Sequence, residues 1–349
     1  MAKFNVIINE IIDIKTDIIN CHAKLKGKLI SKNVIVNDEK LSDMIDKIDD
    51  IKVGGSKLPE WIKDVGLWVS AANIPSVLSY TSAVTINGKV YLFGGYNGSS
   101  TSTTYCYDPV SNTWTTRANR PVALHAISAV TIDGKAYVFG GYSSSSMSCS
   151  NKTHCYDPVS DSWTTKADTP VALGYNSAAV IDGKAYIFGG EGASYYSNTT
   201  YCYDPVSNTW TTKANMPAAL RLPSAVVIDG KAYVFGGFKD NYSYAQTTYC
   251  YDPASNTWTT KANMPVGLQA TSAVTIDGKA YVFGGYGSNG YVNTTYRYDP
   301  VSNTWTTKAN MPNALSYITA VAIDGTPYVF GGYNNSGHAN TTYCYLNSK

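Results

Sequence analysis

The residues that first suggest chemistry form a glycine-rich stretch. Gly285-Tyr-Gly-Ser-Asn-Gly290 matches the G-x-G-x-x-G pattern of dinucleotide-binding sites. Such a site needs a helix directly after the glycines, because the helix N-terminus binds the pyrophosphate. The next segment, Thr294-Thr-Tyr-Arg-Tyr298, has instead the β-branched and aromatic composition of a strand. We therefore interpret the stretch as a turn and expect no dinucleotide cofactor.

Carboxylates and histidines are spread too thinly for a catalytic or metal site. Hydrolysis by paired carboxylates needs two of them in one cleft, yet most aspartates after residue 66 stand in Asp-Gly or Asp-Pro turns. Of the other carboxylates, Glu191 and Asp240 stand in the variable loops that follow two of the glycine pairs, in different parts of the chain. His125, His154 and His338 lack the close spacing of a metal-ligand pair. We predict a protein that is not an enzyme and holds no metal or other cofactor.

Five cysteines share one recurring position between two aromatic or histidine residues. They are Cys106, Cys155, Cys202, Cys250 and Cys344. Equivalent positions of different repeats lie too far apart for a disulfide bond, so we interpret these side chains as buried thiols. A bridge between Cys149 and Cys155 is a weaker alternative.

A repeat organises most of the chain, and glycine pairs and tryptophans mark it. The pairs begin at Gly94, Gly140, Gly189, Gly236, Gly284 and Gly331, and the tryptophans are Trp68, Trp114, Trp163, Trp210, Trp258 and Trp305. Both series advance by 46, 49, 47, 48 and 47 residues. One structural unit is therefore used six times.

Each unit has the composition of four short strands. In the fifth unit, Ser-Ala-Val-Thr-Ile276 and Lys-Ala-Tyr-Val-Phe283 flank an Asp-Gly dipeptide, which favours a tight β-hairpin turn. A third segment ends at Asp-Pro, a turn signal, and the fourth carries the tryptophan. The pattern predicts an antiparallel four-stranded sheet for each repeat.

The double glycine, the tyrosine of the third strand and the tryptophan of the fourth resemble kelch repeats. The resemblance covers about residues 66–345 and implies a β-propeller. Because the first tryptophan precedes the first double glycine and the last unit ends without one, we expect residues 66–70 to complete the last blade. The predicted fold is all-β: a six-bladed propeller with four-stranded antiparallel blades over residues 58–349, closed by its N-terminal strand.

All length variation falls in one connection of the repeat, between the second and third strands. Antiparallel order places this connection on the same face as the segment that leads from one blade to the next. Both are rich in Tyr, Ser, Gly and Asn, the residues that antibodies use for recognition. We predict a binding surface here, with these candidate residues: Tyr80, His125, Tyr175, Arg221, Gln269, Tyr317, Tyr96, Tyr195, Tyr196, Tyr242, Tyr244 and Tyr291.

Residues 1–57 have a different composition and lack the repeat. Phe4, Ile7, Ile11, Ile14 and Ile18 follow the 3–4 spacing of a short coiled coil, and a second amphipathic helix is expected over residues 40–51. The segment resembles the N-terminal helices of phage tail-fibre proteins. It is predicted to join copies of the chain, with a trimer favoured, or to bind other virion structural proteins. Packing of these helices on the propeller is the alternative.

The charge balance and the hydropathy of the sequence exclude two classes of partner, nucleic acids and the membrane interior. Lys+Arg number 27 and Asp+Glu 25, which gives no electrostatic signature of nucleic-acid binding. The sequence shows no apolar run near the ~20 residues of a membrane span and no signal peptide. We expect a phage tail-fibre-like receptor-binding protein in the virion that recognises a cell-surface glycan or protein. The alternatives are a cytoplasmic interaction adaptor and a kelch-type sugar-active enzyme, an oxidase or a sialic-acid isomerase.

The coiled-coil pattern makes a prediction about assembly. Light scattering should give an oligomer for the full chain and a monomer for a chain that starts near Leu58, because the apolar seam lies before that residue. A monomer in both samples would contradict the prediction that residues 1–57 join copies of the chain.

Overall fold

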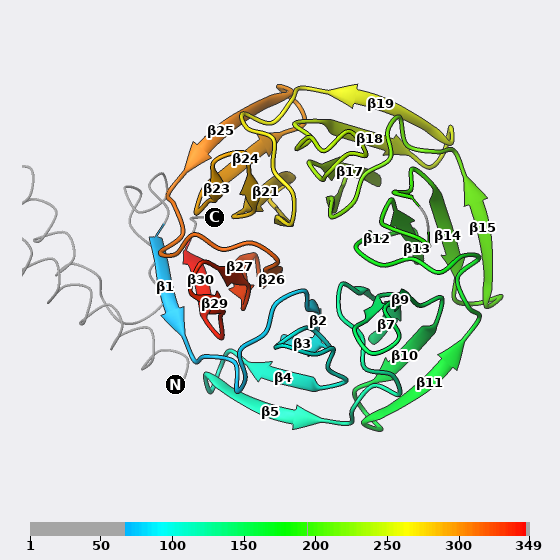
Figure 1. Cartoon of the computed structure of the whole chain (residues 1–349), viewed down its shortest axis with the longest axis vertical. Coiled ribbons are helices and arrows are strands. Elements are labelled where there is room, and N and C mark those ends of the chain that lie inside the picture. Colours follow the sequence, from blue (N-terminus) through cyan, green and yellow to red (C-terminus); the bar gives the residue numbers. More distant parts are fainter. Residues whose placement is uncertain (1–66, 194, 347–349) are drawn as a thin grey trace, which may run out of the picture. The chain divides into compact units, whose positions relative to one another are not determined.

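Six four-stranded antiparallel sheets follow one another around a central axis, as the repeat predicted (Figure 1). The computed structural model describes residues 67–193 and 195–346, and the predicted helices of residues 1–57 lie outside this range. Within the described residues all regular elements are strands. The six-bladed propeller is therefore confirmed.

The blades run from an inner strand at the axis to an outer strand at the rim. The first three are β2 (Ser82–Ile86), β3 (Lys89–Phe93), β4 (Thr104–Asp108), β5 (Thr113–Arg117); β6 (Ser128–Ile132), β7 (Lys135–Phe139), β10 (Thr153–Asp157), β11 (Ser162–Lys166); and β12 (Ser177–Ile181), β13 (Lys184–Phe188), β14 (Thr200–Asp204), β15 (Thr209–Lys213). The others are β16 (Ser224–Ile228), β17 (Lys231–Phe235), β18 (Thr248–Asp252), β19 (Thr257–Lys261); β20 (Ser272–Ile276), β21 (Lys279–Phe283), β24 (Thr295–Asp299), β25 (Thr304–Lys308); and β26 (Thr319–Ile323), β27 (Thr326–Phe330), β30 (Thr342–Leu346), β1 (Leu67–Ala71). Three loops carry small hairpins: β8 (Tyr142–Ser143) with β9 (Ser148–Cys149), β22 (Tyr286–Gly287) with β23 (Gly290–Tyr291), and β28 (Tyr333–Asn334) with β29 (Gly337–His338).

The ring closes through β1, which pairs antiparallel with β30 from the other end of the chain (Figure 1). Trp68 lies opposite Tyr345 in this register. Its indole N–H donates to the carbonyl of Ala309 at 3.0 Å, and its ring packs edge-on against Phe283 at 5.4 Å. The predicted closure of the last blade is confirmed.

Neighbouring blades are held together by a repeated clamp on one alanine. The N–H of Ala72 donates to Asn112 Oδ1 at 2.8 Å, and its carbonyl accepts from the indole N–H of Trp114 at 2.8 Å. The same amide oxygen of Asn112 accepts from the buried Tyr107 hydroxyl. Equivalent clamps hold Ala118, Ala167, Ala214 and Ala262. Each clamp gives hydrogen-bond partners to both the N–H and the carbonyl of the alanine that connects two blades, and so it fixes the angle at which the blades meet.

The double glycines are required where one blade touches the next. Gly94 has φ 56°, and a Cβ built on it would lie 2.4 Å from the carbonyl oxygen of Leu124. Any larger residue would push the blades apart. The recurring cysteines, Cys106 among them, are buried and form no disulfide bond within the described residues, as predicted, and Cys149 is not bridged to Cys155.

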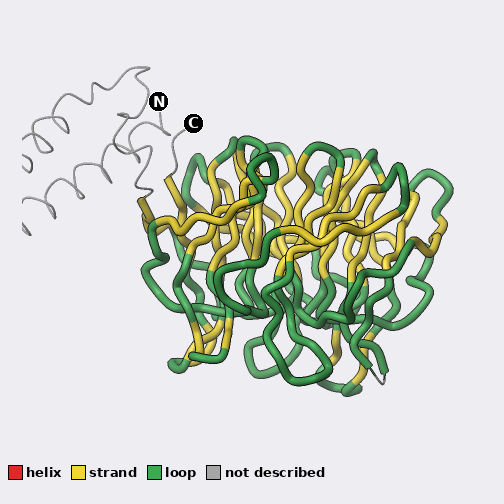
Figure 2. Tube along the Cα trace, turned by 90° about the horizontal axis from the view of Figure 1, so that it is seen from above, coloured by secondary structure: helices red, strands yellow, loops and turns green. Residues whose placement is uncertain are grey.

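The two faces of the ring differ in their connections. One face, which we call the loop face, carries the variable loops and lies below the strands in Figure 2. The opposite face carries uniform turns, in which the Asp108 carboxylate accepts from the N–H of Val110 and pairs with Lys89 at 3.0 Å. The search for membrane-spanning helices finds none in the described part of the chain.

One buried charge breaks the repeat. Arg120 is 2% exposed and stands where three other blades have methionine, for example Met216. Its Nη2 donates to the carbonyl of Gly140 at 3.3 Å, whereas Nε and Nη1 have no acceptor among the described residues. Burial lowers the pKa of the guanidinium. An unpaired charge in an apolar contact costs stability.

Arg120→Met should therefore stabilise the propeller. We expect a gain of about 1–3 kcal/mol in the free energy of unfolding, because the change removes a buried charge and restores the residue of the other blades. Chemical denaturation measures it, with Met216→Arg as the mirror variant that should destabilise. An Arg120→Met protein less stable than the wild type would contradict this reading.

Candidate functional site

The axial mouth of the loop face is built by a closed ring of six backbone hydrogen bonds. In each blade, the residue two positions before the inner strand donates its backbone N–H to the carbonyl of the equivalent residue in the preceding blade, at 2.8–3.2 Å. The chain of donors runs Ala126, Tyr175, Leu222, Ala270, Tyr317 and Tyr80, and Tyr80 closes it onto Tyr317. The ring fixes the position of every blade at the axis.

These six residues share a left-handed backbone although none is glycine. Their φ angles lie between 51° and 57°. This conformation costs roughly 1–2 kcal/mol for a residue with a Cβ. It aims the side chains of Tyr80, Tyr175 and Tyr317 over the opening, and strain of this kind clusters at functional sites.

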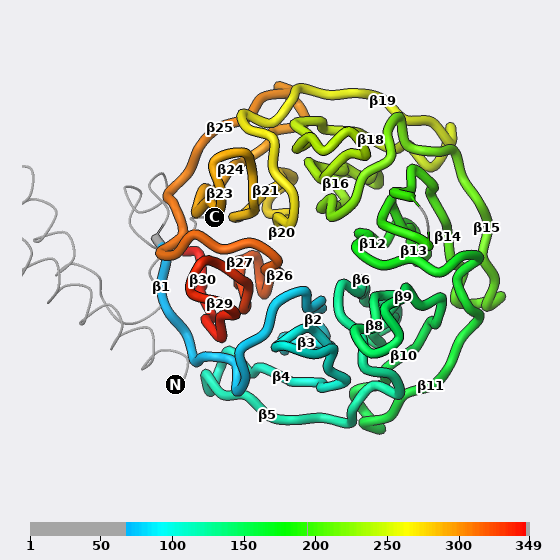
Figure 3. Tube along the Cα trace, viewed as in Figure 1, coloured from blue at the N-terminus to red at the C-terminus, as the bar shows by residue number. Residues whose placement is uncertain are grey.

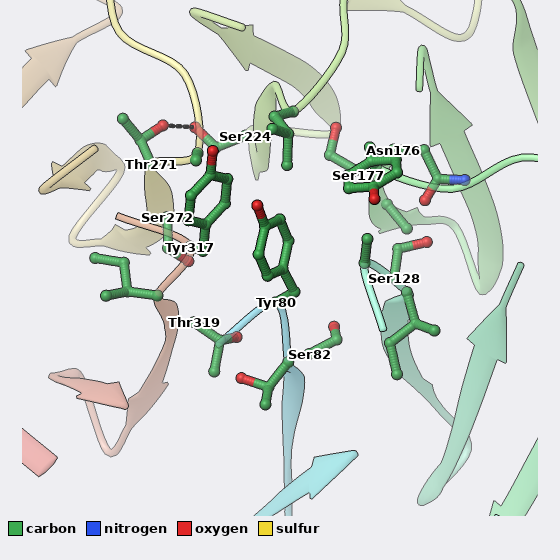
Figure 4. Close-up of a pocket in the computed structure, with 18 of the residues that line it drawn as sticks. Tyr80, Ser82, Ser128, Asn176, Ser177, Ser224, Thr271, Ser272, Tyr317 and Thr319 are labelled. Atoms are coloured by element: carbon green, nitrogen blue, oxygen red, sulfur yellow. Dashed lines mark hydrogen bonds between the residues drawn. The ribbon is translucent and has the colours of Figure 1, made fainter. Parts of the chain in front are cut away.

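Tyr80 and Tyr317 stack across the opening. Their ring centroids are 3.9 Å apart at an interplanar angle of 23°. Burial and the neighbouring Tyr317 raise the pKa of Tyr80, so its phenol is neutral at neutral pH. Together with alanines and other apolar residues the two stacked tyrosines line a cavity of about 180 Å³, whose polar residues are serines, threonines and one asparagine, including Ser128, Asn176 and Ser177 beside Tyr80 (Figure 4).

Around this mouth runs a chain of aromatic rings that we call the aromatic belt. Successive centroids are 4.8–6.3 Å apart. All six blades contribute, and the sheets can be followed in Figure 3. The belt consists of Tyr196, Phe238, Tyr244, Tyr286, Tyr291, Tyr333, His338, Tyr96, His125, Tyr142 and Tyr175. Nine of these rings are half-buried, so each keeps an edge or face in solvent.

Two histidines of the belt are fixed by serines. His125 Nδ1 lies 2.9 Å from Ser100 Oγ, and His338 Nδ1 lies 2.9 Å from Ser79 Oγ. Burial lowers the pKa of His125 to about 4, helped by the charge of Arg221, and burial also lowers the pKa of His338. Both histidines are therefore neutral near neutral pH.

The belt is open at one place, between Tyr175 and Tyr196, which we call the notch. Glu191 lies there, and Arg221 reaches across from the next blade. The guanidinium stands 4.0 Å from the centroid of the Tyr175 ring, and its Nε lies 2.5 Å from Glu191 Oε2. The exposed fractions of the Arg221 and Glu191 side chains are 23% and 34%.

The structure separates the predicted binding residues into layers. Tyr80 and Tyr317 form the central stack, and Arg221 occupies the notch. Six lie in the belt: His125, Tyr175, Tyr96, Tyr196, Tyr244 and Tyr291. Gln269 is buried behind the belt, where its backbone bridges Tyr286. Tyr195 and Tyr242 are 79% and 84% exposed and lie outside the belt.

Several belt residues were missed by sequence reasoning. They share a signal, because each directly follows a double glycine: Tyr142, Phe238, Tyr286 and Tyr333, as well as the already predicted Tyr96. Five of the six repeats carry an aromatic residue there, and Glu191 is the exception. His338 carries no such signal, because only folding brings it 5.5 Å from Tyr96.

The charged and metal-binding side chains do not gather on the loop face. Within residues 67–193 and 195–346, no group of three His, Cys, Asp or Glu side chains is placed to hold a metal ion. The arrangement provides aromatic surface, neutral hydroxyls and one ion pair. Such a surface is suited to binding a ligand that is apolar on one side and hydrogen-bonding on the other.

The fold is shared with known proteins. The sequence model of the KLHDC2/KLHL20/DRC7 Kelch-repeats domain matches residues 80–264 and again 224–348. Among solved structures, the one titled "Structure of YjhT" superposes with a TM-score of 0.71 at 18% sequence identity, covering 80% of this chain and 97% of that chain, a likeness of fold. A search of curated proteins finds no match. The chain therefore belongs to the kelch-repeat β-propeller family.

Proposed function

We propose that the protein is a non-enzymatic recognition module that binds a cell-surface glycan through the loop face. The observation that carries the proposal is the aromatic belt around a polar mouth. A sugar ring has an apolar C–H face and a rim of hydroxyls, so it can pack on tyrosine rings while it hydrogen-bonds to their hydroxyls and to serine. A protein partner is the alternative ligand.

The limited exposure of the belt favours a small polar ligand, and a large protein partner is less well matched to it. Its rings are mostly half-buried, and among its tyrosines and phenylalanine none reaches the exposure of Tyr195 or Tyr242. Stable protein partners bury about 800 Å² on each side over an apolar centre. The centre of this face is instead a polar depression flanked by Ser128 and Asn176.

We also propose a tail-fibre-like role in a phage particle. In this arrangement residues 1–57 would join several propellers or attach them to other virion proteins. Several weak sites on one stalk raise the effective affinity by ~10²–10⁴. This would suit a shallow binding face whose ion pair carries no net charge.

Glycan binding and the belt can be tested together. On a glycan array, the full chain should bind a subset of glycans and leave them chemically unchanged. Tyr291→Ala and Tyr333→Ala should each weaken binding about tenfold, since one stacked ring contributes on the order of 1–2 kcal/mol. Val206→Ala, in an exposed turn of the opposite face, is the control. Conversion of a bound sugar would support the enzyme alternative, and retention of a purified surface protein in place of any glycan would support the protein alternative.

The histidines of the belt predict the pH dependence. Burial holds the pKa of His125 near 4, so this side chain stays neutral from about pH 8 down to about pH 5.5, and burial lowers the pKa of His338 below its ordinary value. Glycan affinity measured by calorimetry should therefore stay constant through about pH 6.5, the ordinary pKa of histidine, and should change only at lower pH. A transition centred near pH 6.5 would contradict the neutral belt.

A further inference from the structure

The notch is the one place where the repeat departs from an aromatic belt, and two substitutions make it. Glu191 replaces the aromatic residue that follows the double glycine in the other five blades. Its backbone bridging partner is Gly174, where other blades carry a side chain such as Ser, His, Arg or Gln. A missing ring beside a missing side chain leaves a gap in the belt.

The gap is filled by a partly exposed ion pair. Arg221 extends from the neighbouring blade, stacks on Tyr175 and pairs with Glu191. The contact engages Oε2 of the carboxylate and Nε of the guanidinium. A carboxylate accepts about four hydrogen bonds and a guanidinium donates five, so both groups retain capacity toward solvent. The notch thus presents an acceptor beside a donor, with the Tyr196 ring at its border.

We propose that the notch is the specificity-determining subsite of the loop face and takes a neutral vicinal diol of a sugar. One hydroxyl donates to Glu191, and its neighbour accepts from Arg221. This inference rests on the proposed glycan binding. It assigns to two named residues the choice among glycans, while the belt supplies affinity for all of them.

The charges around the notch favour a neutral sugar over an acidic one. The carboxylate of Glu191 cancels the guanidinium of Arg221, and the next loop carries Lys239 beside Asp240. His125, which also faces Arg221, is neutral above about pH 5. An acidic sugar would have to displace Glu191 from Arg221. It would also be repelled by the negative charge of Glu191, whose side chain is 34% exposed. Negative charge is thus rejected, which is a common basis of specificity.

The test uses an array of hexose-terminated neutral glycans and sialic-acid-terminated glycans with the full chain. Wild-type protein should prefer the neutral group. Glu191→Gln should weaken binding of the neutral glycans about tenfold, because a hydrogen bond to a charged group is lost, and should reduce the preference over sialylated ones. Asp133→Asn, which removes an equal charge from an exposed turn of the opposite face and gives it the residue of the first blade, Asn87, should leave affinity and ranking unchanged.

The double variant Glu191→Gln with Arg221→Gln is the control for misfolding of the single variant. It leaves no unpaired charge, and glutamine is the residue of the fifth blade at the Arg221 position, Gln269. A folded double variant should still bind through the belt but should no longer rank glycans as the wild type does. Unaltered ranking in both variants, or a wild-type preference for sialylated glycans, would overturn the inference alone. A wild-type protein that binds no glycan would overturn the proposed function and this inference together.

Discussion

Pairing of β1 with β30 is the interaction on which the rest of the molecule depends. Five residues from the start of the propeller lie against five from its last segment, from Leu67 with Leu346 to Ala71 with Thr342. Without this pairing the sixth blade would lack its outer strand and would expose the edge of β30. The ring of hydrogen bonds at the mouth closes only between Tyr80 and Tyr317, which belong to the first and last repeats. A closed ring is thus needed before any of the loop face can form.

The loop face illustrates how near-identical repeats produce one asymmetric surface. Each blade is clamped to the next by the same tryptophan and, in most blades, the same asparagine, so the scaffold is uniform. The strained backbone at the mouth is uniform as well, with φ near 55° in all six blades. Variation is confined to the side chains that this frame presents. Where five blades supply an aromatic ring and one supplies Glu191, a belt with a single opening results.

Much of this architecture could be predicted from the sequence, because its signals lie within single repeats. Glycine pairs, Asp-Gly turns and the tryptophan of the fourth strand each report a backbone or packing need within one repeat, and their spacing counts the blades. The layers of the mouth could not be predicted in this way. Tyr80 and His125 had the same predicted role in their repeats. In the structure Tyr80 has the left-handed backbone and belongs to the ring of hydrogen bonds at the mouth, whereas His125 precedes the left-handed residue of its own blade and pairs with Tyr142. The sequence could not separate the two positions, because no glycine marks the left-handed one. Contacts such as Tyr96 with His338 join residues more than two hundred positions apart, and only ring closure creates them.

The central claim is that this closed ring serves to present one binding face. A crystal structure of the full chain with a glycan selected on the array tests it most directly. We expect electron density for sugar rings over the aromatic belt, in contact with half-buried tyrosines of at least two blades. Density for the glycan on the Asp-Pro turns of the opposite face, or along the outer strands, would contradict it.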